Sequence, residues 1–340
     1  MDFQLPIKIP ALPEPLTYRD NLLLIGSCFT EHIGNKLQEL KFNVLQNPNG
    51  ILFDPQSVAA SLVSYIRPTQ YTEADLFYLN ELWQSWQHHS QFSDIDKNSC
   101  LERINHAQQT AHTFLQTANC IIITLGASFS YRLTDQFAAA HGTAAGKLGD
   151  PVANCHRAPA QWFTKHLMGI EETNAVLDNC IHQLLHFNPA LKIIFTVSPV
   201  RHIRDGVIEN NRSKARLIEV VHNLVNKFDR LFYFPAYELV IDVLRDYRFY
   251  DIDMVHPNYP ATEFVLEKFT RFGIAEESWQ VMEEVKKIVI AARHKAFQPQ
   301  TNAHKQFLLL HLEKTKELQA KYPFLKLDRE VAYFTSGLQY

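Results

Sequence analysis

The sequence lacks the features that mark several large classes of protein. In 340 residues no apolar run reaches the roughly 20 residues that a membrane-spanning helix needs. The N-terminal segment carries prolines at positions 6, 10, 13 and 15 and has no basic region followed by an apolar stretch, so we expect no signal peptide. The five cysteines form no C-x-x-C pair and no regular framework, which indicates free thiols in a reducing compartment, by default the cytoplasm. They are Cys28, Cys100, Cys120, Cys155 and Cys180.

An excess of positive charge is also absent. Lys and Arg number 33 against 36 Asp and Glu, the formal net charge is -3, and no basic block occurs, so we expect no nucleic-acid or membrane partner. No Walker loop, G-x-G-x-x-G or H-E-x-x-H motif appears, which argues against a bound nucleotide, a dinucleotide cofactor or a catalytic zinc ion. Asn154-Cys155-His156 places a thiol near an imidazole, but without a second ligand pair it predicts no metal site.

The apolar pattern that is present predicts an α/β fold. Hydrophobic residues make up 46% of the sequence, which is enough for a sizeable core. Helical stripes at i, i+3/i+4 and i+7 separate short apolar runs that have the length of strands. Near-continuous apolar strands separated by helices are typical of a parallel sheet covered on both faces, so we predict a three-layer α/β/α fold with a five-stranded parallel sheet. The predicted strands are 22–25, 42–45, 121–125, 193–197 and 231–234.

Two stretches interrupt this alternation, and the chain ends in a helical pattern. We assign residues 1–274 to one domain with insertions near 71–95 and 127–169, which are expected to leave the sheet and wall its carboxyl edge. In the first insertion, Trp83 and Trp86 beside His88 form either a sugar-stacking platform or packing under a loop. Residues 275–340 are expected to be a helical extension packed on the core or on a second copy of the chain.

The first predicted strand runs into Gly26-Ser27-Cys28, where an amphipathic helix begins. One interpretation is that Ser27 is an ordinary helix N-cap. The other is that Gly26 allows a tight turn, which exposes the Ser27 hydroxyl as a nucleophile beside the positive end of the helix dipole. Cys28 competes for this role, because a helix N-terminus lowers the pKa of a thiol.

A histidine and a carboxylate follow the last predicted strand. Asp253 and His256 are three residues apart, so the carboxylate can accept a hydrogen bond from Nδ1–H of the imidazole while Nε2 faces outward. Pro257 biases His256 away from helical backbone angles. In a parallel sheet this motif and Ser27 meet at the carboxyl edge, so we predict a Ser-His-Asp site there.

Six ordered blocks lie between residues 26 and 258: GSCF at 26–29, NPNGILFDP at 47–55, TLGASFSY at 124–131, VANCHR at 152–157, SPVRHIRDG at 198–206 and FPAYELVIDVLRDYRFYDIDMVHPN at 234–258. Together they resemble the GSCFA-domain family, which is placed in the SGNH (GDSL-type) hydrolase superfamily. The resemblance covers roughly residues 20–270 and implies a flavodoxin-like sheet of SGNH type. It also implies that Ser27 is the nucleophile, Asp253 the orienting acid and His256 the base.

The resemblance also implies an oxyanion hole, but this sequence departs from the superfamily pattern at one of its donors. The backbone N–H groups of Ser27 and Gly50 are the implied donors, but the usual Gly-x-Asn after the third strand is replaced by Gly126-Ala127-Ser128. Ser128, or Asn154 or His156 from the second insertion, is expected to replace the Asn, or else the oxyanion site is weaker. Expected substrate-binding residues are Cys28, Gly126, His156, Arg201 and His202.

By superfamily analogy, the expected activity is hydrolysis of a small acyl ester, such as an acetylated carbohydrate, without metal or cofactor. Three alternatives stay open. The first is that the protein transfers the acyl group to another alcohol, and the second is that Cys28 is the nucleophile. Alternatively it is a binding protein on a hydrolase scaffold, in keeping with the missing Gly-x-Asn.

Overall fold

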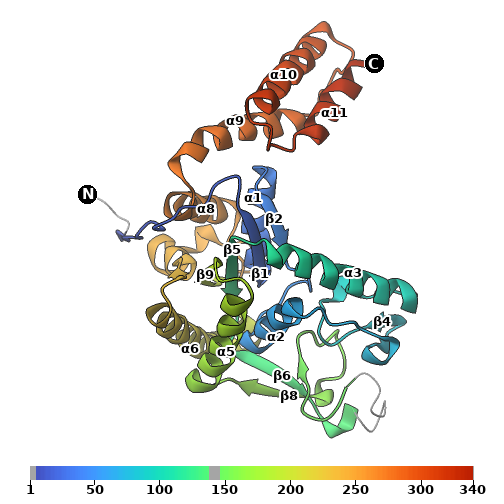
Figure 1. The fold of residues 1–340 in the computed structure, drawn as a ribbon, viewed down its shortest axis with the longest axis vertical. Helices are drawn as coiled ribbons and strands as arrows, with labels where there is room; N and C mark the ends of the chain where they lie inside the picture. The colour runs from blue at the N-terminus through green and yellow to red at the C-terminus, as the bar shows by residue number, and fades with distance from the viewer. Residues whose placement is uncertain (1–4, 138–145, 340) are drawn as a thin grey trace.

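A computed structural model describes residues 5–137 and 146–339, and its centre is a five-stranded parallel sheet (Figure 1). The strand order is β10-β9-β5-β1-β2, so the first strand in the sequence lies inside the sheet, between β5 and β2. The strands are β1 (Asn21–Gly26), β2 (Asn43–Gln46), β5 (Cys120–Leu125), β9 (Lys192–Val197) and β10 (Leu231–Tyr233).

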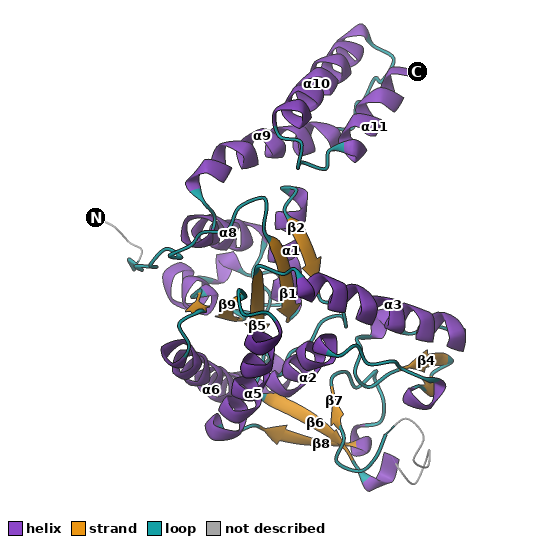
Figure 2. Cartoon of the chain, viewed as in Figure 1, coloured by secondary structure: helices purple, strands orange, loops and turns teal. Residues whose placement is uncertain are grey.

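Helices cover both faces of this sheet, because successive strand residues point to opposite sides. Leu22 and Leu24 of β1 join one apolar cluster, and Leu23 and Ile25 join the other. Figure 2 shows the resulting layers, which confirm the predicted α/β/α class. The first cluster involves α1 (Cys28–Glu39), α8 (Tyr259–Gly273) and α7 (Ala236–Glu238) with the π-helical turn Leu239–Leu244. The second involves α2 (Pro55–Ile66), α3 (Lys97–Gln116), α5 (Ile170–Phe187) and α6 (Gly206–Lys227).

The two insertions form small antiparallel sheets. The first contains the hairpin β3 (Phe77–Leu79) and β4 (Leu82–Gln84). The second contains β6 (Phe129–Leu133), β7 (Pro151–Val152) and β8 (Phe163–Leu167), in the order β7-β6-β8, and its residues 138–145 lie outside the described part. Trp86 is buried and stacks on Phe77 at 3.7 Å between ring centroids, so its ring packs inside the insertion and is no platform for a sugar.

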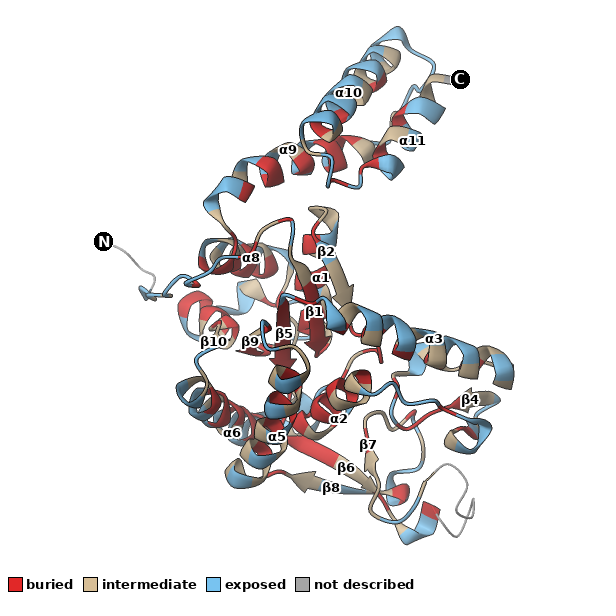
Figure 3. Cartoon of the chain, in the orientation of Figure 1, coloured by how far each residue is buried: buried red, intermediate tan, exposed pale blue. Residues whose placement is uncertain are grey.

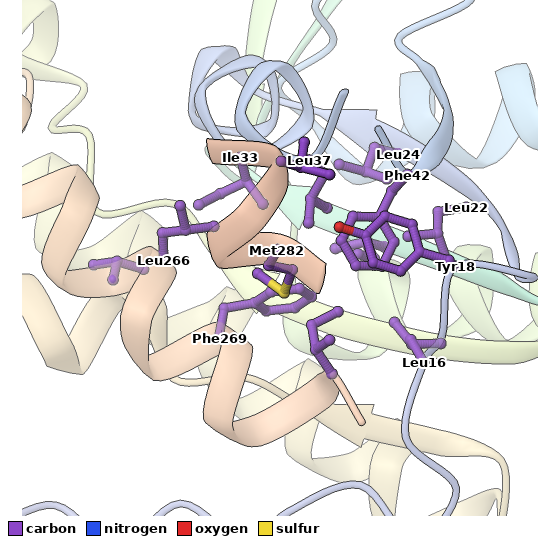
Figure 4. Close-up of a cluster of buried hydrophobic side chains, with 14 of the residues drawn as sticks. Leu16, Tyr18, Leu22, Leu24, Ile33, Leu37, Phe42, Leu266, Phe269 and Met282 are labelled. Carbon is purple, nitrogen blue, oxygen red and sulfur yellow. The ribbon is translucent and has the colours of Figure 1, made fainter. Parts of the chain in front are cut away.

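The C-terminal extension consists of α9 (Glu276–Ala292), α10 (Asn302–Lys321) and α11 (Asp328–Ser336). Met282 of α9 reaches the cluster formed by β1, α1 and α8 (Figure 4), so the extension packs on the core of its own chain. The ion pair between Lys41 and Glu330, at 2.6 Å, adds a polar contact. Figure 3 shows α10 and α11 projecting from the α/β domain with largely exposed outer faces. Within the described ranges no helix combines the length and apolar character needed to cross a membrane.

Candidate active site

The turn after β1 depends on a glycine. Gly26 has φ of +137°, and a Cβ atom there would lie 2.1 Å from the carbonyl oxygen of Thr124 on β5. Only glycine allows this conformation and this close approach. Its N–H donates to Oδ1 of Asn47 at 2.9 Å, so the loop after β2 is tied to the same turn. Gly26 thereby sets the positions of Ser27 and Cys28 at the start of α1.

Ser27 occupies the N-cap position but does not act as a cap. Its side chain makes no cap hydrogen bond, and Oγ is buried without a hydrogen-bond partner. The residue is 1% exposed, and its backbone N–H donates to the Thr124 carbonyl at 3.1 Å. The N-cap interpretation is therefore wrong, and the hydroxyl predicted as the nucleophile is sealed from solvent in this conformation.

Cys28, the first residue of α1, is partly exposed. Burial raises the pKa of its thiol above the ordinary value. The positive charge of Lys214 opposes this rise, as do the backbone N–H groups of Phe29 and of Cys28 itself, which face the sulfur. Those N–H groups belong to the first turn of the helix, where they have no partner within the helix. Cys28 is thus a protonated thiol in the neutral range, and Lys214 and the helix N-terminus offset only part of the effect of burial on the thiolate.

Asp253 and His256 form the pair that their spacing predicts. Nδ1 of His256 lies 2.6 Å from Oδ2 of Asp253, and Oδ1 of Asp253 accepts the backbone N–H groups of Val255 and His256. The hydrogen bond from the His256 side chain, followed by the two backbone N–H groups, lowers the pKa of Asp253 to about 2. The His256 and Asp253 side chains are 41% and 45% exposed, so a substrate has access to the imidazole.

Contacts with the segment after β9 hold this loop at the carboxyl edge of the sheet. The backbone N–H of Arg201 donates to the Val255 carbonyl at 3.3 Å, and its guanidinium donates to the Met254 carbonyl at 2.9 Å. The guanidinium also lies over the Tyr250 ring, 4.1 Å from its centroid. Arg201 therefore positions the loop that carries His256.

The charge of His256 affects a residue of the first turns of α1. His32 is four residues after Cys28, so the two side chains share one face of the helix. The pKa of His32 is lowered by loss of water around the ring and next by the charge of His256. This coupling relates His256 to His32, which shares a helix face with Cys28. Because Ser27 Oγ has no hydrogen-bond partner, the structure does not join it to His256.

The two backbone groups expected to form the oxyanion hole are already hydrogen-bonded. The N–H of Gly50 donates to the Asn47 carbonyl at 2.7 Å, and the N–H of Ser27 donates to Thr124. Gly50 has φ of +80°, and a Cβ there would lie 2.2 Å from Cβ of His89, which explains the glycine without an oxyanion role. The first-turn N–H groups of α1 are better placed to stabilise charge at Cys28.

The side chains predicted to replace the missing Asn are held by other contacts. The N–H of Ser128 donates to Ser213 Oγ at 2.7 Å, and Ser128 Oγ donates to the Ser213 carbonyl at 3.1 Å. Asn154 Oδ1 accepts the His156 N–H, and His156 Nε2 lies 2.8 Å from the Ser85 carbonyl oxygen. These contacts are structural, and the predicted donor role of Ser128, Asn154 or His156 finds no support in this geometry.

The remaining predicted substrate contacts are also part of the scaffold. His202 Nε2 lies 3.2 Å from Asp205, and its backbone N–H donates to Asn210. The Gly126 carbonyl accepts a hydrogen bond from Lys214. A substrate contact by Arg201, His202 or Gly126 stays a prediction.

Sequence reasoning missed His32 and Lys214. The helical spacing from Cys28 was a signal for His32. For Lys214, the apolar stripe Leu217, Val221, Leu224 extended backwards by three residues reaches position 214, so the lysine lies on the buried face of its helix. The structure confirms this burial.

A cavity of about 500 Å³ lies away from these residues. Its lining includes Lys36 and Glu39 from the last turn of α1, Tyr259 and Glu263 of α8 and Trp279 of α9, whereas Cys28 is at the first turn of α1. Across the described ranges, no three or more His, Cys, Asp or Glu side chains are grouped so as to hold a metal ion. The candidate site therefore lies outside this cavity, at the carboxyl edge of the sheet.

Comparison with protein families agrees with the resemblance of the sequence blocks. Residues 21–269 match the GSCFA family, and residues 285–340 match the GSCFA domain protein C-terminal domain. The chain belongs to the GSCFA family. No curated protein matches the chain closely enough to count as a relative.

Proposed function

We propose that this protein hydrolyses an acyl ester on an SGNH-type scaffold, with Cys28 as the nucleophile, His256 as the base and Asp253 as its orienting partner. The difference between two neighbours carries the proposal. Ser27 Oγ is enclosed and unpartnered, whereas Cys28 is partly exposed. Cys28 also lies one helical turn before His32, the residue of α1 whose pKa the charge of His256 lowers. A nucleophile has to reach its substrate, so access favours the thiol.

The first half of the reaction forms a thioester. His256 Nε2 takes the proton from Cys28 Sγ as the sulfur attacks the carbonyl carbon. The C–S bond forms, the C–O bond to the alcohol breaks, and the leaving oxygen receives the proton from His256. Because burial keeps the resting thiol protonated, the base is needed at the moment of attack. Asp253, ionised throughout the neutral range, stabilises the imidazolium.

The second half regenerates the thiol. His256 takes a proton from water, the hydroxide attacks the thioester carbonyl, and the C–S bond breaks as the sulfur regains its proton. In both halves the carbonyl oxygen becomes negative next to the N–H groups of Cys28 and Phe29, which face the sulfur. These donors partly replace the side chain that the superfamily supplies through Gly-x-Asn.

The test compares Cys28→Ala, Cys28→Ser and Ser27→Ala in hydrolysis of p-nitrophenyl acetate. We expect Cys28→Ala to lose roughly 100-fold or more in kcat/KM. Ser27→Ala should retain activity within about threefold, and because it removes an unpaired buried hydroxyl it should not lower the free energy of unfolding. Iodoacetamide should abolish turnover, with the modification mapped to Cys28 by mass spectrometry.

The opposite pattern would support the original prediction of Ser27. In that case Ser27→Ala is inactive, Cys28→Ala keeps activity, and a fluorophosphonate labels Ser27. Hydrolysis no faster than the uncatalysed background in the wild type and in all three variants would support the binding-protein interpretation.

A further inference from the structure

Lys214 is a buried cation without a carboxylate partner. It lies on α6, is 1% exposed, and forms no ion pair with any of the described acidic residues. Its Nζ donates to the carbonyl oxygens of Gly126 and Ser198, each at 2.6 Å. These carbonyls directly follow β5 and β9, so the amine is anchored at the carboxyl edge of the sheet. A buried charge is costly, and one that has no countercharge invites a functional explanation.

The two hydrogen bonds to carbonyl oxygens leave one N–H or lone pair of Lys214 Nζ without a use. An ammonium group has three N–H donors, and a neutral amine has two N–H donors and a lone pair. Two donors suffice for the two carbonyls, so Lys214 keeps the same hydrogen bonds in either protonation state. The charge of Lys214 is therefore separable from its structural contacts.

Cys28 lies at the same edge of the sheet as this charge. Gly26 of β1 is paired with Thr124 of β5, so Cys28 and the Gly126 carbonyl that anchors Lys214 both come two residues after this pair. Lys214 lowers the pKa of the Cys28 thiol, and Cys28 in turn raises the pKa of Lys214 against the larger effect of burial, which lowers it to about 7. The other ionisable neighbours are His202, whose pKa Lys214 helps to lower, and Asp205, which pairs with His202. The strand ends that anchor Lys214 contribute only carbonyls.

We propose that Lys214 is a positioning residue for Cys28: its buried ammonium holds positive charge next to the sulfur and stabilises the thiolate produced at attack. This inference rests on the proposed function, because that function requires Cys28 to form a thiolate during attack. Lys214 transfers no proton, since His256 accepts it. Lys214 contacts the segment in which the superfamily has its Asn donor: the Gly126 carbonyl accepts a hydrogen bond from Lys214, and the Ser128 N–H donates to Ser213.

The experiment measures the rate of iodoacetamide alkylation at Cys28, mapped by mass spectrometry, from pH 6 to pH 10. Lys214→Met removes the charge and the anchor, and Lys214→Gln removes the charge but keeps an amide donor. Lys214→Arg keeps the charge. Ser213→Ala is the structural control, because it removes the Oγ contact with Ser128 and leaves the charge in place.

We expect Lys214→Met and Lys214→Gln to alkylate roughly tenfold more slowly than the wild type at pH 6, which corresponds to a rise of about one unit in the pKa of Cys28. The deficit should shrink towards pH 10, because Lys214 itself is neutral there. Lys214→Arg should restore most of the rate, and Ser213→Ala should match the wild type. A purely structural role would not produce this pH dependence.

Equal alkylation profiles in the wild type and in Lys214→Gln would overturn the inference, as would a deficit that is the same at every pH. Folding of each variant is checked by urea unfolding, and Lys214→Gln decides if Lys214→Met does not fold. Because alkylation needs no substrate, its outcome is separate from the proposed function. A Cys28→Ala variant that retains turnover would refute the cysteine mechanism while leaving the effect of Lys214 on the thiol intact.

Discussion

Two regions of the molecule hold histidines in opposite environments. In the insertions, His88 is 0% exposed and His156 is 7% exposed, and both contact aromatic rings. Burial lowers the pKa of His88 to about 3 and of His156 to about 4. In the loop before α8, His256 is open to solvent and hydrogen-bonded to an ionised Asp253. Access and a carboxylate partner, more than the presence of an imidazole, therefore distinguish a candidate base from a packing residue.

The largest effect is expected from His256→Gln, which removes the proposed base. We expect kcat/KM for p-nitrophenyl acetate to fall by roughly 10² to 10⁴. The free energy of unfolding should change by less than about 0.5 kcal/mol, because the side chain is exposed. His156→Asn is the matched substitution in the buried region and should leave the proposed hydrolysis by the folded protein unchanged. Comparable losses of activity in the two variants would remove the distinction between the regions.

The second expected effect is a loss in the free energy of unfolding at low pH, caused by the buried histidine His156. A histidine with an ordinary pKa of 6.5 in the unfolded chain and about 4 in the native state binds more protons when unfolded. Its stabilising effect is therefore complete above pH 6.5 and is lost as the pH falls from 6.5 towards 4. For His156 this loss amounts to about 2 kcal/mol at pH 5.

Urea unfolding at pH 7 and pH 5 tests this expectation. His156→Asn should lose about 2 kcal/mol less than the wild type between the two pH values, whatever its stability at pH 7. Asn is a suitable replacement because residue 156 has φ of +48°, which asparagine tolerates. His106→Asn on the exposed side of α3 is the control and should behave as the wild type. An identical pH dependence in His156→Asn would mean that His156 does not stay neutral in the folded protein.

Much of the fold and half of the candidate site follow from local sequence patterns. All five predicted strands are confirmed within a few residues, because strands buried on both faces give near-continuous apolar runs. The hydrogen bond between Asp253 and His256 also depends on residues close in sequence. A spacing of three in a turn was enough to predict it.

The choice between Ser27 and Cys28 was not predictable in the same way. Which side chain is enclosed depends on how closely Gly26 approaches Thr124 of β5, a contact between segments far apart in sequence. The same holds for Lys214, whose two carbonyl partners follow different strands. The insertion strands were missed because β6 pairs with β7 and β8 rather than continuing the main sheet. Tertiary contacts decide such features, and local patterns do not encode them.

The smallest effect is expected from Arg201→Lys, which tests how rigidly the open region must be held. Lysine keeps the positive charge and the backbone contact to Val255, but it lacks the planar guanidinium that contacts the Met254 carbonyl and the Tyr250 ring. Because Asp253 still binds the loop backbone, we expect kcat to fall only about three- to tenfold, with KM nearly unchanged.

Steady-state kinetics of Arg201→Lys are compared with those of Arg248→Lys, since Arg248 is exposed and pairs with Asp246 instead of holding the loop. A large rise in KM in Arg201→Lys alone would indicate that Arg201 contacts the substrate, as the sequence predicted. An unchanged kcat would show that the loop needs no tether, so that the carboxylate alone orients His256. The expected small loss in kcat places Arg201 between these limits, as a residue that limits the motion of the imidazole relative to Cys28.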